Sequence, residues 1–134
     1  MIEVGGAVRA SDYALVLGSN RARARHLRLA ATRIDEAFQV LACAPATRTR
    51  DASGMRYLNA AIRIRSGLSL QALRDALRAI EDETGRTRGS VEVTLDIDIV
   101  ASRGSDGAWL VHKADDLQRA YVRTLLQRIG VEPG

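Results

Sequence analysis

The segment that most constrains this chain is TLDIDIV at residues 94–100, where two aspartates alternate with apolar, mostly β-branched residues. Its composition, free of glycine and proline, predicts a β-strand. Side chains alternate between the two faces of a strand, so Asp96 and Asp98 share one face and the apolar residues point into a core on the other. Neighbouring carboxylates disfavour each other's ionisation, and Mg²⁺ removes that cost. The pair therefore indicates a Mg²⁺ site, with a half-exposed strand that tolerates aspartate as the structural alternative.

The chain of 134 residues, 46% hydrophobic and 27% charged, has the length and composition of one globular domain, residues 1–134, with a flexible lead-in over residues 1–11. No apolar run approaches the ~20 residues that span a bilayer, and the first ten residues lack the layout of a signal peptide. The only cysteine, Cys43, has no partner for an internal disulfide and no neighbouring zinc ligands, so we expect a small core residue there. These features predict a cytoplasmic protein without a membrane partner.

The net charge of +4 comes almost entirely from arginine, with Lys113 as the only lysine. Arginine suits phosphate, because its planar fork donates two parallel hydrogen bonds. An arginine-rich composition also follows from genomic base composition, which is the explanation we favour. Basic character alone therefore does not indicate a nucleic-acid partner.

Hydrophobic periodicity predicts elements in the order β-α-β-β-α-β-α. The expected strands cover residues 13–17, 38–44, 56–65 and 94–100, with a short edge strand at 109–111; the expected helices cover 21–37 and 69–84, with a last helix along Leu117, Tyr121, Leu125 and Ile129. This order predicts an α+β fold, a ferredoxin-like βαββαβ sandwich with an additional C-terminal helix. Its four-stranded, mainly antiparallel sheet carries both main helices on one face and leaves the other face available for a ligand.

Local signals mark the ends of these elements. The expected helix N-caps are Ser19 or Asn20, Ser69, and Asp115 or Asp116. Gly85 is expected to end the second helix, and residues 46–55 to form a long exposed loop of the kind that often serves a site. In the strand at 56–65, Tyr57 and Asn59 lie on the polar side, which predicts that they share a face with the aspartate pair.

Four short motifs occur in order along the chain. They are Leu17-Gly18-Ser19-Asn20, Tyr57-Leu58-Asn59-Ala60-Ala61, Ile80-Glu81 followed by Gly85-Arg86 and Arg88, and Thr94-Leu95-Asp96-Ile97-Asp98-Ile99. At this spacing the chain resembles the 6-hydroxymethyl-7,8-dihydropterin pyrophosphokinases of the folate pathway. Each motif alone is weak, but together they span residues 13–100 and indicate common ancestry.

The resemblance implies a transferase of the kinase type that moves a diphosphate from ATP to the hydroxymethyl group of the dihydropterin and releases AMP. It implies two Mg²⁺ ions bound with ATP by Asp96 and Asp98, and a catalytic role for Arg86 beside them. The implied ATP contacts are Glu81, Arg88, His112 and Arg119, and the implied pterin contacts are Gly18, Tyr57, Asn59 and Tyr121. His112 and Arg119 match the family more loosely, because their spacing shifts by one residue.

The structural alternatives remain open for several of these residues. Arg86 and Arg88 fit equally well as solvent-facing charges of a loop. The structural alternative for Glu81 is an ion pair with Arg78 or Arg86. Tyr57 and Tyr121 read as half-buried aromatics, and a lone histidine such as His112 is more often incidental.

The chain also departs from the family. Gly89-Ser90-Val91-Glu92-Val93 stands where the family has a longer loop with arginines, a tryptophan that closes over pterin, and Gly-Pro-Arg; residues 46–50 and the C-terminal tail differ as well. Because closure excludes water from such sites, the chain reads as a slow enzyme, an enzyme for another pterin-like substrate, or a non-catalytic ligand-binding or regulatory module. An RNA-binding ferredoxin-like domain is disfavoured, because such sheets stack bases on aromatic residues, which are few here.

Overall fold

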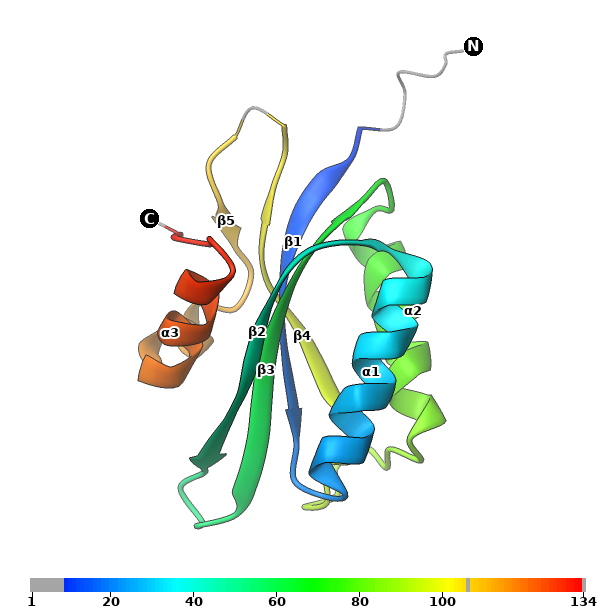
Figure 1. Cartoon of the computed structure of the whole chain (residues 1–134), viewed down its shortest axis with the longest axis vertical. Helices are drawn as coiled ribbons and strands as arrows, with labels where there is room; N and C mark the ends of the chain where they lie inside the picture. The colour runs from blue at the N-terminus through cyan, green and yellow to red at the C-terminus, as the bar shows by residue number, and fades with distance from the viewer. Residues whose placement is uncertain (1–8, 106, 134) are drawn as a thin grey trace.

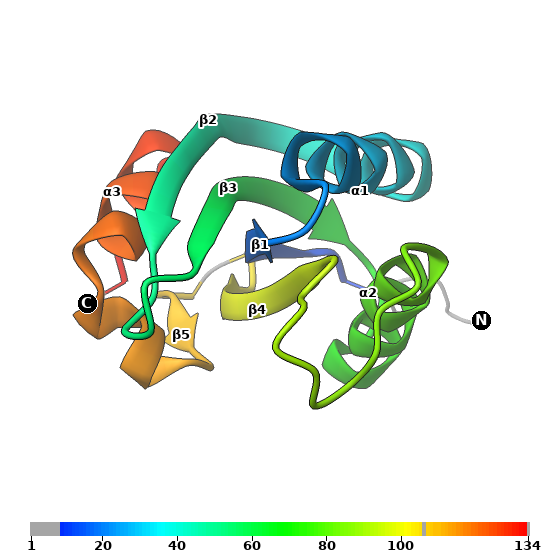
Figure 2. The ribbon, with the colours of Figure 1, turned by 90° about the horizontal axis from the view of Figure 1, so that it is seen from below.

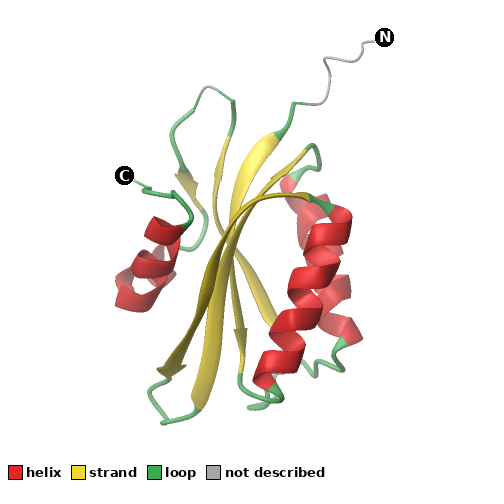
Figure 3. Cartoon of the chain, in the orientation of Figure 1, coloured by secondary structure: helices red, strands yellow, loops and turns green. Residues whose placement is uncertain are grey.

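The computed structural model describes residues 9–105 and 107–133, and its elements follow the expected order. The elements are β1 (Ser11–Ser19), α1 (Arg23–Ala37), β2 (Gln39–Arg50), β3 (Arg56–Ser66), α2 (Leu70–Glu83), β4 (Asp96–Arg103), β5 (Leu110–Val111), the 3₁₀ helix η2 (Ala114–Gln118) and α3 (Ala120–Arg128). The predicted α+β fold with a ferredoxin-like core and a C-terminal helix is confirmed (Figure 3). None of the helices described is both long and apolar enough to cross a membrane.

The strands form one antiparallel sheet in the order β2-β3-β1-β4-β5 (Figure 1). β1 lies at its centre, as its continuous apolar run predicts, because both faces of that strand are buried. Leu15 and Leu17 point into one core, whereas Ala14 and Val16 point into the other. The expected edge strand is present as β5, which pairs with the end of β4 and makes the sheet five-stranded.

The helices α1 and α2 pack on one face of the sheet, as predicted (Figure 2). Leu27, Ala30 and Ile34 of α1 and Leu73, Leu77 and Ile80 of α2 form their buried stripes. These side chains share a core with Leu95, just before β4, and with Ile97 and Ile99 of β4, the apolar residues that alternate with the aspartates. The aspartates are therefore turned to the opposite face.

That opposite face is only partly open, which corrects the expectation that it stays available for a ligand. The helix α3 covers one part of it, burying Val122, Leu125 and Leu126 against Ala14, Val16 and Val100 of the central strands. Figures 1 and 2 place α3 on the side of the sheet away from α1 and α2. The uncovered end lies near Gly18, where β1 leads into α1.

The strand β2 is longer than predicted and replaces half of the expected loop at 46–55. Residues 47–50 pair with β3 from Thr47 opposite Asn59 to Arg50 opposite Arg56. Pro45 made this stretch read as a loop, but the ladder shifts register between Ala44 and Thr47, which is where an edge strand tolerates proline. Only residues 51–55 form the connecting turn, in which the carboxylate of Asp51 accepts hydrogen bonds from later backbone amides.

Cys43 is exposed, so its assignment to the core was wrong. It lies on β2, an edge strand of the sheet that pairs with a neighbour on one side only. The expected lead-in at residues 1–11 falls mostly outside the described residues. Within them, Ser11 already begins β1 opposite Ser66, and Asp12 is held by ion pairs to Arg63 and Arg65 of β3.

The helix caps were predicted with mixed success. Ser69 caps α2 by accepting a hydrogen bond from the Ala72 amide, and Gly85 follows that helix with a φ of +79°, as expected. The N-cap of α1 is Ala22, whose φ is +46° and whose side chain cannot accept a hydrogen bond, so the expectation of Ser19 or Asn20 was wrong. Ser19 bonds instead to the Arg21 backbone, and Asn20 to the backbone of Val91 and Val93.

The last helix also begins without the predicted cap. Asp115 and Asp116 lie in the separate helix η2, and α3 starts after Arg119 with no side-chain cap.

Candidate active site

A row of three residues crosses the sheet at the open end of its second face. Gly18 of β1 pairs with Asn59 of β3 on one side and with Asp96 of β4 on the other. A Cβ at Gly18 would lie 2.9 Å from Asn59 Nδ2, so a larger residue would displace the amide from its place over β1. The missing side chain lets the Asn59 amide lean over β1 toward the aspartate strand.

Hydrogen bonds hold the buried Asn59 side chain in this position. Thr49 Oγ1 donates to Asn59 Oδ1, and Asn59 Nδ2 lies 3.5 Å from the Leu17 carbonyl oxygen. The second bond is long, so the amide group keeps donor capacity toward the space above the sheet.

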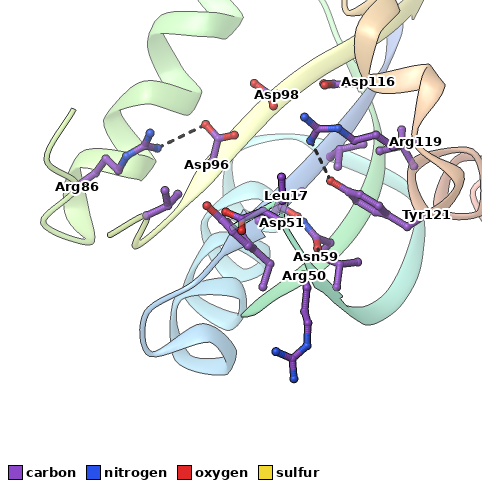
Figure 4. A pocket seen from close by; sticks show the side chains of 17 residues that line it. Leu17, Arg50, Asp51, Asn59, Arg86, Asp96, Asp98, Asp116, Arg119 and Tyr121 are labelled. Carbon is purple, nitrogen blue, oxygen red and sulfur yellow. Dashed lines mark hydrogen bonds and ion pairs between the residues drawn. The ribbon is translucent and has the colours of Figure 1, made fainter. Parts of the chain in front are cut away.

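This row forms the floor of a cavity of about 630 Å³ (Figure 4). The expected site residues that line it are Gly18, Tyr57, Asn59, Arg86, Asp96, Asp98, Arg119 and Tyr121. They come from β1, β3, β4, the loop after α2 and the start of α3. Tyr57, Asn59 and the aspartate pair were predicted to share one face of the sheet, and they do. Strand alternation together with the register of the strands determines this face.

The aspartate pair is electrostatically unfavourable as it stands. Burial raises the pKa of Asp98 to about 7, and the neighbouring charge of Asp96 adds to the effect, whereas Lys113 opposes it. Two cations stand close by: Lys113 Nζ lies 3.6 Å from Asp98 Oδ1, and Arg86 Nη1 lies 3.4 Å from Asp96 Oδ1. Both distances are long for ion pairs, so neither aspartate is firmly neutralised.

These carboxylates fit a magnesium ion. The residues described contain no group of three or more histidine, cysteine and acidic side chains that could hold a metal. Mg²⁺ does not require such a group, since it keeps several waters and is held by one or two carboxylates together with phosphates. A pair of carboxylates of which one resists ionisation is an environment that a divalent cation stabilises.

Arg86 lies in the loop after α2, and its side chain reaches Asp96, the first of the two aspartates. Its Nη1 donates to the Leu95 carbonyl oxygen at 2.7 Å, which fixes the guanidinium beside β4. Its Nε is buried and meets no acceptor among the described residues. A buried donor without a partner is costly, so this atom is a candidate to donate to an anionic ligand.

Glu81 and Arg88 lie outside this cavity and form a structural clamp. The buried Glu81 carboxylate accepts one hydrogen bond from the Ile97 backbone amide and one from Arg88 Nη1, both at 2.7 Å. Its partner is therefore Arg88, not the alternatives Arg78 or Arg86. The clamp joins the end of α2 to β4 on the side facing away from the cavity.

His112 also lies outside the cavity, with its Nε2 hydrogen-bonded to Ser102 Oγ at 2.7 Å. Burial, and to a smaller extent the charge of Arg74, lower its pKa. Arg119 and Tyr121, by contrast, face the aspartates across the cavity and contact each other (Figure 4).

Comparison with protein families matches residues 14–130 to the family described as 7,8-dihydro-6-hydroxymethylpterin-pyrophosphokinase. The matched region contains every residue that lines the cavity. The chain belongs to this family. The resemblance inferred from the four motifs is thereby confirmed, and with it the family's place in folate biosynthesis. A search of curated proteins found no match.

The loop at residues 89–93, where we expect the chain to depart from the family, is held beside the cavity by hydrogen bonds. Asn20 holds it on both sides: its Nδ2 donates to the Val91 carbonyl oxygen at 2.8 Å, and its Oδ1 accepts from the Val93 amide at 2.7 Å. Arg21 and Glu92 add an exposed ion pair. Val93 lines the cavity, so an aliphatic side chain forms the wall at this point.

Sequence reasoning missed several residues that line this cavity. Further lining residues are Val16, Leu17, Thr49, Arg50, Asp51, Ala52, Val93, Asp116 and Val122. Thr49 could not be placed from alternation alone, because counting from Ala44 turns it to the other face and only the register shift between Ala44 and Thr47 brings its hydroxyl to Asn59. Asp116 carried no local signal, because only the packing of η2 brings it toward Asp98.

Proposed function

We propose that this chain transfers a diphosphate from ATP to the hydroxymethyl oxygen of 6-hydroxymethyl-7,8-dihydropterin and releases AMP, with two Mg²⁺ ions bound at Asp96 and Asp98. Family membership supports the reaction class. The single observation that carries the proposal is the row of Asn59, Gly18 and Asp96, which sets an amide donor and a metal-binding carboxylate over one cavity.

The acceptor end of the cavity suits a flat, polar heterocycle. Asn59 presents amide hydrogens that can donate to a ring carbonyl or ring nitrogen, and Thr49 fixes the amide's orientation by occupying its oxygen. Tyr57 and Tyr121 contribute aromatic surface to the same walls. Together these groups orient the pterin so that its hydroxymethyl group points toward the aspartate pair.

The donor end suits a polyphosphate. The bound Mg²⁺ ions would neutralise phosphate charge and orient the phosphates, and such transfer depends mainly on positioning and charge. In the transfer, the hydroxymethyl oxygen forms a bond to the β-phosphorus, the bond from that phosphorus to the α,β-bridging oxygen breaks, and the hydroxyl proton is released. Arg86 supplies a fixed positive charge, and its free Nε gains an acceptor when a phosphate oxygen binds.

A second candidate function is ligand binding without catalysis. The observation in its favour is the loop at 89–93, in which Val93 lines the cavity where the family has a closing tryptophan and arginines nearby. Incomplete closure leaves water in the site and weakens its electrostatic interactions.

The test is a reaction of the purified protein with ATP, MgCl₂ and the dihydropterin, followed by ³¹P NMR and mass spectrometry. Equal amounts of AMP and pterin diphosphate, formed only when all three components are present, support the proposal. Formation of ADP or free phosphate contradicts the assigned bond cleavage. Binding of ATP and pterin without AMP favours the non-catalytic alternative.

A further inference from the structure

Lys113, the only lysine of the chain, is the ion-pair partner of Asp98. Its backbone is anchored beside β4, because the amides of His112 and Lys113 both donate to the Val100 carbonyl oxygen, at 2.7 and 3.4 Å. From there the side chain reaches back along β4 and brings Nζ to 3.6 Å from Asp98 Oδ1. The ammonium therefore occupies the space beside a proposed Mg²⁺ ligand.

The contact between them is loose. The Lys113 side chain is 50% exposed and that of Asp98 is 30% exposed, and no hydrogen bond within 3.5 Å joins them in the described part of the chain. A lysine ammonium is a hydrated point charge on a flexible four-carbon stem, unlike the fixed fork of arginine. Such a group can leave a carboxylate at little cost when a stronger cation arrives.

A second cavity, of about 260 Å³, lies beside the same aspartates, and the Lys113 side chain lines it. Asp96 and Asp98 line both cavities, whereas Lys113, Arg74 and Arg78 line only the second one. Neither of these arginines forms an ion pair with another described residue. Asp75 and Glu81 line this space as well, so its charge is mixed, and Lys113 is the cation in it that already contacts a proposed Mg²⁺ ligand. A nucleotide phosphate bound to that metal would lie within reach of the same ammonium.

We propose that Lys113 is an exchangeable cation of this site. In the metal-free protein it lies beside Asp98 and offsets part of its charge, and when Mg²⁺ binds Asp98 it moves onto a phosphoryl oxygen of the bound ATP. This inference rests on the proposed function and adds to it a positioning residue that competes with the metal in one state and binds the nucleotide in the other.

The exchange predicts that one substitution changes two affinities in opposite directions. Lys113→Met keeps an unbranched stem that is one atom shorter and removes the charge. We expect the variant to bind Mn²⁺ alone, measured by electron paramagnetic resonance as a substitute for Mg²⁺, about threefold more tightly than the wild type, because no ammonium competes for Asp98. We expect it to bind the Mg²⁺ complex of the unreactive α,β-methylene analogue of ATP about tenfold more weakly.

Two further variants separate this role from a structural one. Lys113→Arg restores the charge and is expected to recover most of the nucleotide affinity. Arg25→Met removes an exposed cation from α1 and is expected to change neither affinity. A purely structural role for Lys113 would weaken both affinities in Lys113→Met, and that result, or no change in either, overturns the inference.

The two proposals fail in distinguishable ways. If the wild type binds Mn²⁺ but no ATP analogue, the proposed function is contradicted. If it binds both normally and Lys113→Met leaves the Mn²⁺ affinity unchanged, only the exchange by Lys113 is contradicted.

Discussion

Gly18 and Asn59 lie opposite each other on β1 and β3, so close that a Cβ added to Gly18 would be 2.9 Å from Asn59 Nδ2. Gly18→Ala should therefore push the amide away from its position over β1 while leaving the strand intact, because Gly18 does not have a positive φ. We expect pterin binding to weaken by about tenfold, as measured by calorimetry, because one oriented hydrogen bond is lost. Binding of the Mg²⁺–nucleotide complex should change by less than about threefold.

Gly107→Ala is the matched control, since its added Cβ would meet its nearest described neighbour, the Gly104 backbone nitrogen, only at 4.0 Å. Equal effects of the two substitutions on pterin binding would show that Gly18 does not act through Asn59.

Glu81 should matter for stability, because its buried carboxylate joins Arg88 to the Ile97 amide. Glu81→Gln removes the charge from both hydrogen bonds, and we expect the free energy of unfolding in urea to fall by about 1–3 kcal/mol. Glu83→Gln is the control: its side chain is 42% exposed and pairs with Arg33, so its change should stay within about 0.5 kcal/mol. Similar losses in the two variants would contradict the clamp.

The raised pKa of Asp98 predicts a pH dependence of stability with a definite sign. Its pKa of about 7 in the folded chain exceeds the ordinary value of 3.8, so the folded state binds the proton more tightly than the unfolded state. The contribution of this group to stability therefore falls as the pH rises from about 4 to 7.

Comparison of the wild type with Asp98→Asn isolates this contribution. The variant should match the wild type near pH 4 and exceed its free energy of unfolding by about 1–3 kcal/mol at pH 8 without metal. Thermal or urea unfolding at both pH values measures the difference. A variant that is less stable than the wild type at pH 8 would mean that Asp98 is already neutralised in the folded state.

The core of the fold was predictable because its signals are local. The strand period of residues 56–65 and the helix stripe of Leu73, Leu77 and Ile80 fix which faces are buried, and the element order then selects the sandwich. The shared face of Asn59 and Asp96 follows from the same alternation. Residues 47–50 were missed because Pro45 and polar side chains look like a loop unless a neighbouring strand is known to pair with them.

Parts of the site depend on contacts that no local pattern specifies. Glu81 pairs with Arg88 and not with Arg78, because β4 packs against the end of α2 and brings the Ile97 amide to the Glu81 carboxylate. That packing is a tertiary contact, which the local sequence does not specify. Lys113 and Asp116, two charged neighbours of Asp98, lie between β5 and α3. Their spacing in the sequence does not determine how close they come to Asp98. For the same reason Cys43 was misplaced, since only the strand order shows that β2 is at an edge.

The short loop at 89–93 predicts weak use of the standard pterin. Stacking of a base on an aromatic side chain contributes roughly 1–3 kcal/mol, so a site without the closing tryptophan should bind 6-hydroxymethyl-7,8-dihydropterin about one to two orders of magnitude more weakly than a closed one. We expect slow turnover together with readily measured nucleotide binding. Tight binding and fast turnover would contradict this and point to residues 49–52, which also line the cavity, as the group that replaces the lid.

The central claim is that Asp96 and Asp98 hold the metal-bound nucleotide, and calorimetric titration with the Mg²⁺ complex of α,β-methylene ATP tests it most directly. Asp96→Asn and Asp98→Asn each remove one negative charge that the cation needs, and both should stay folded. We predict that each variant binds the complex at least about 30-fold more weakly than the wild type and loses the dependence of binding on Mg²⁺. Wild-type affinity in either variant would contradict the account.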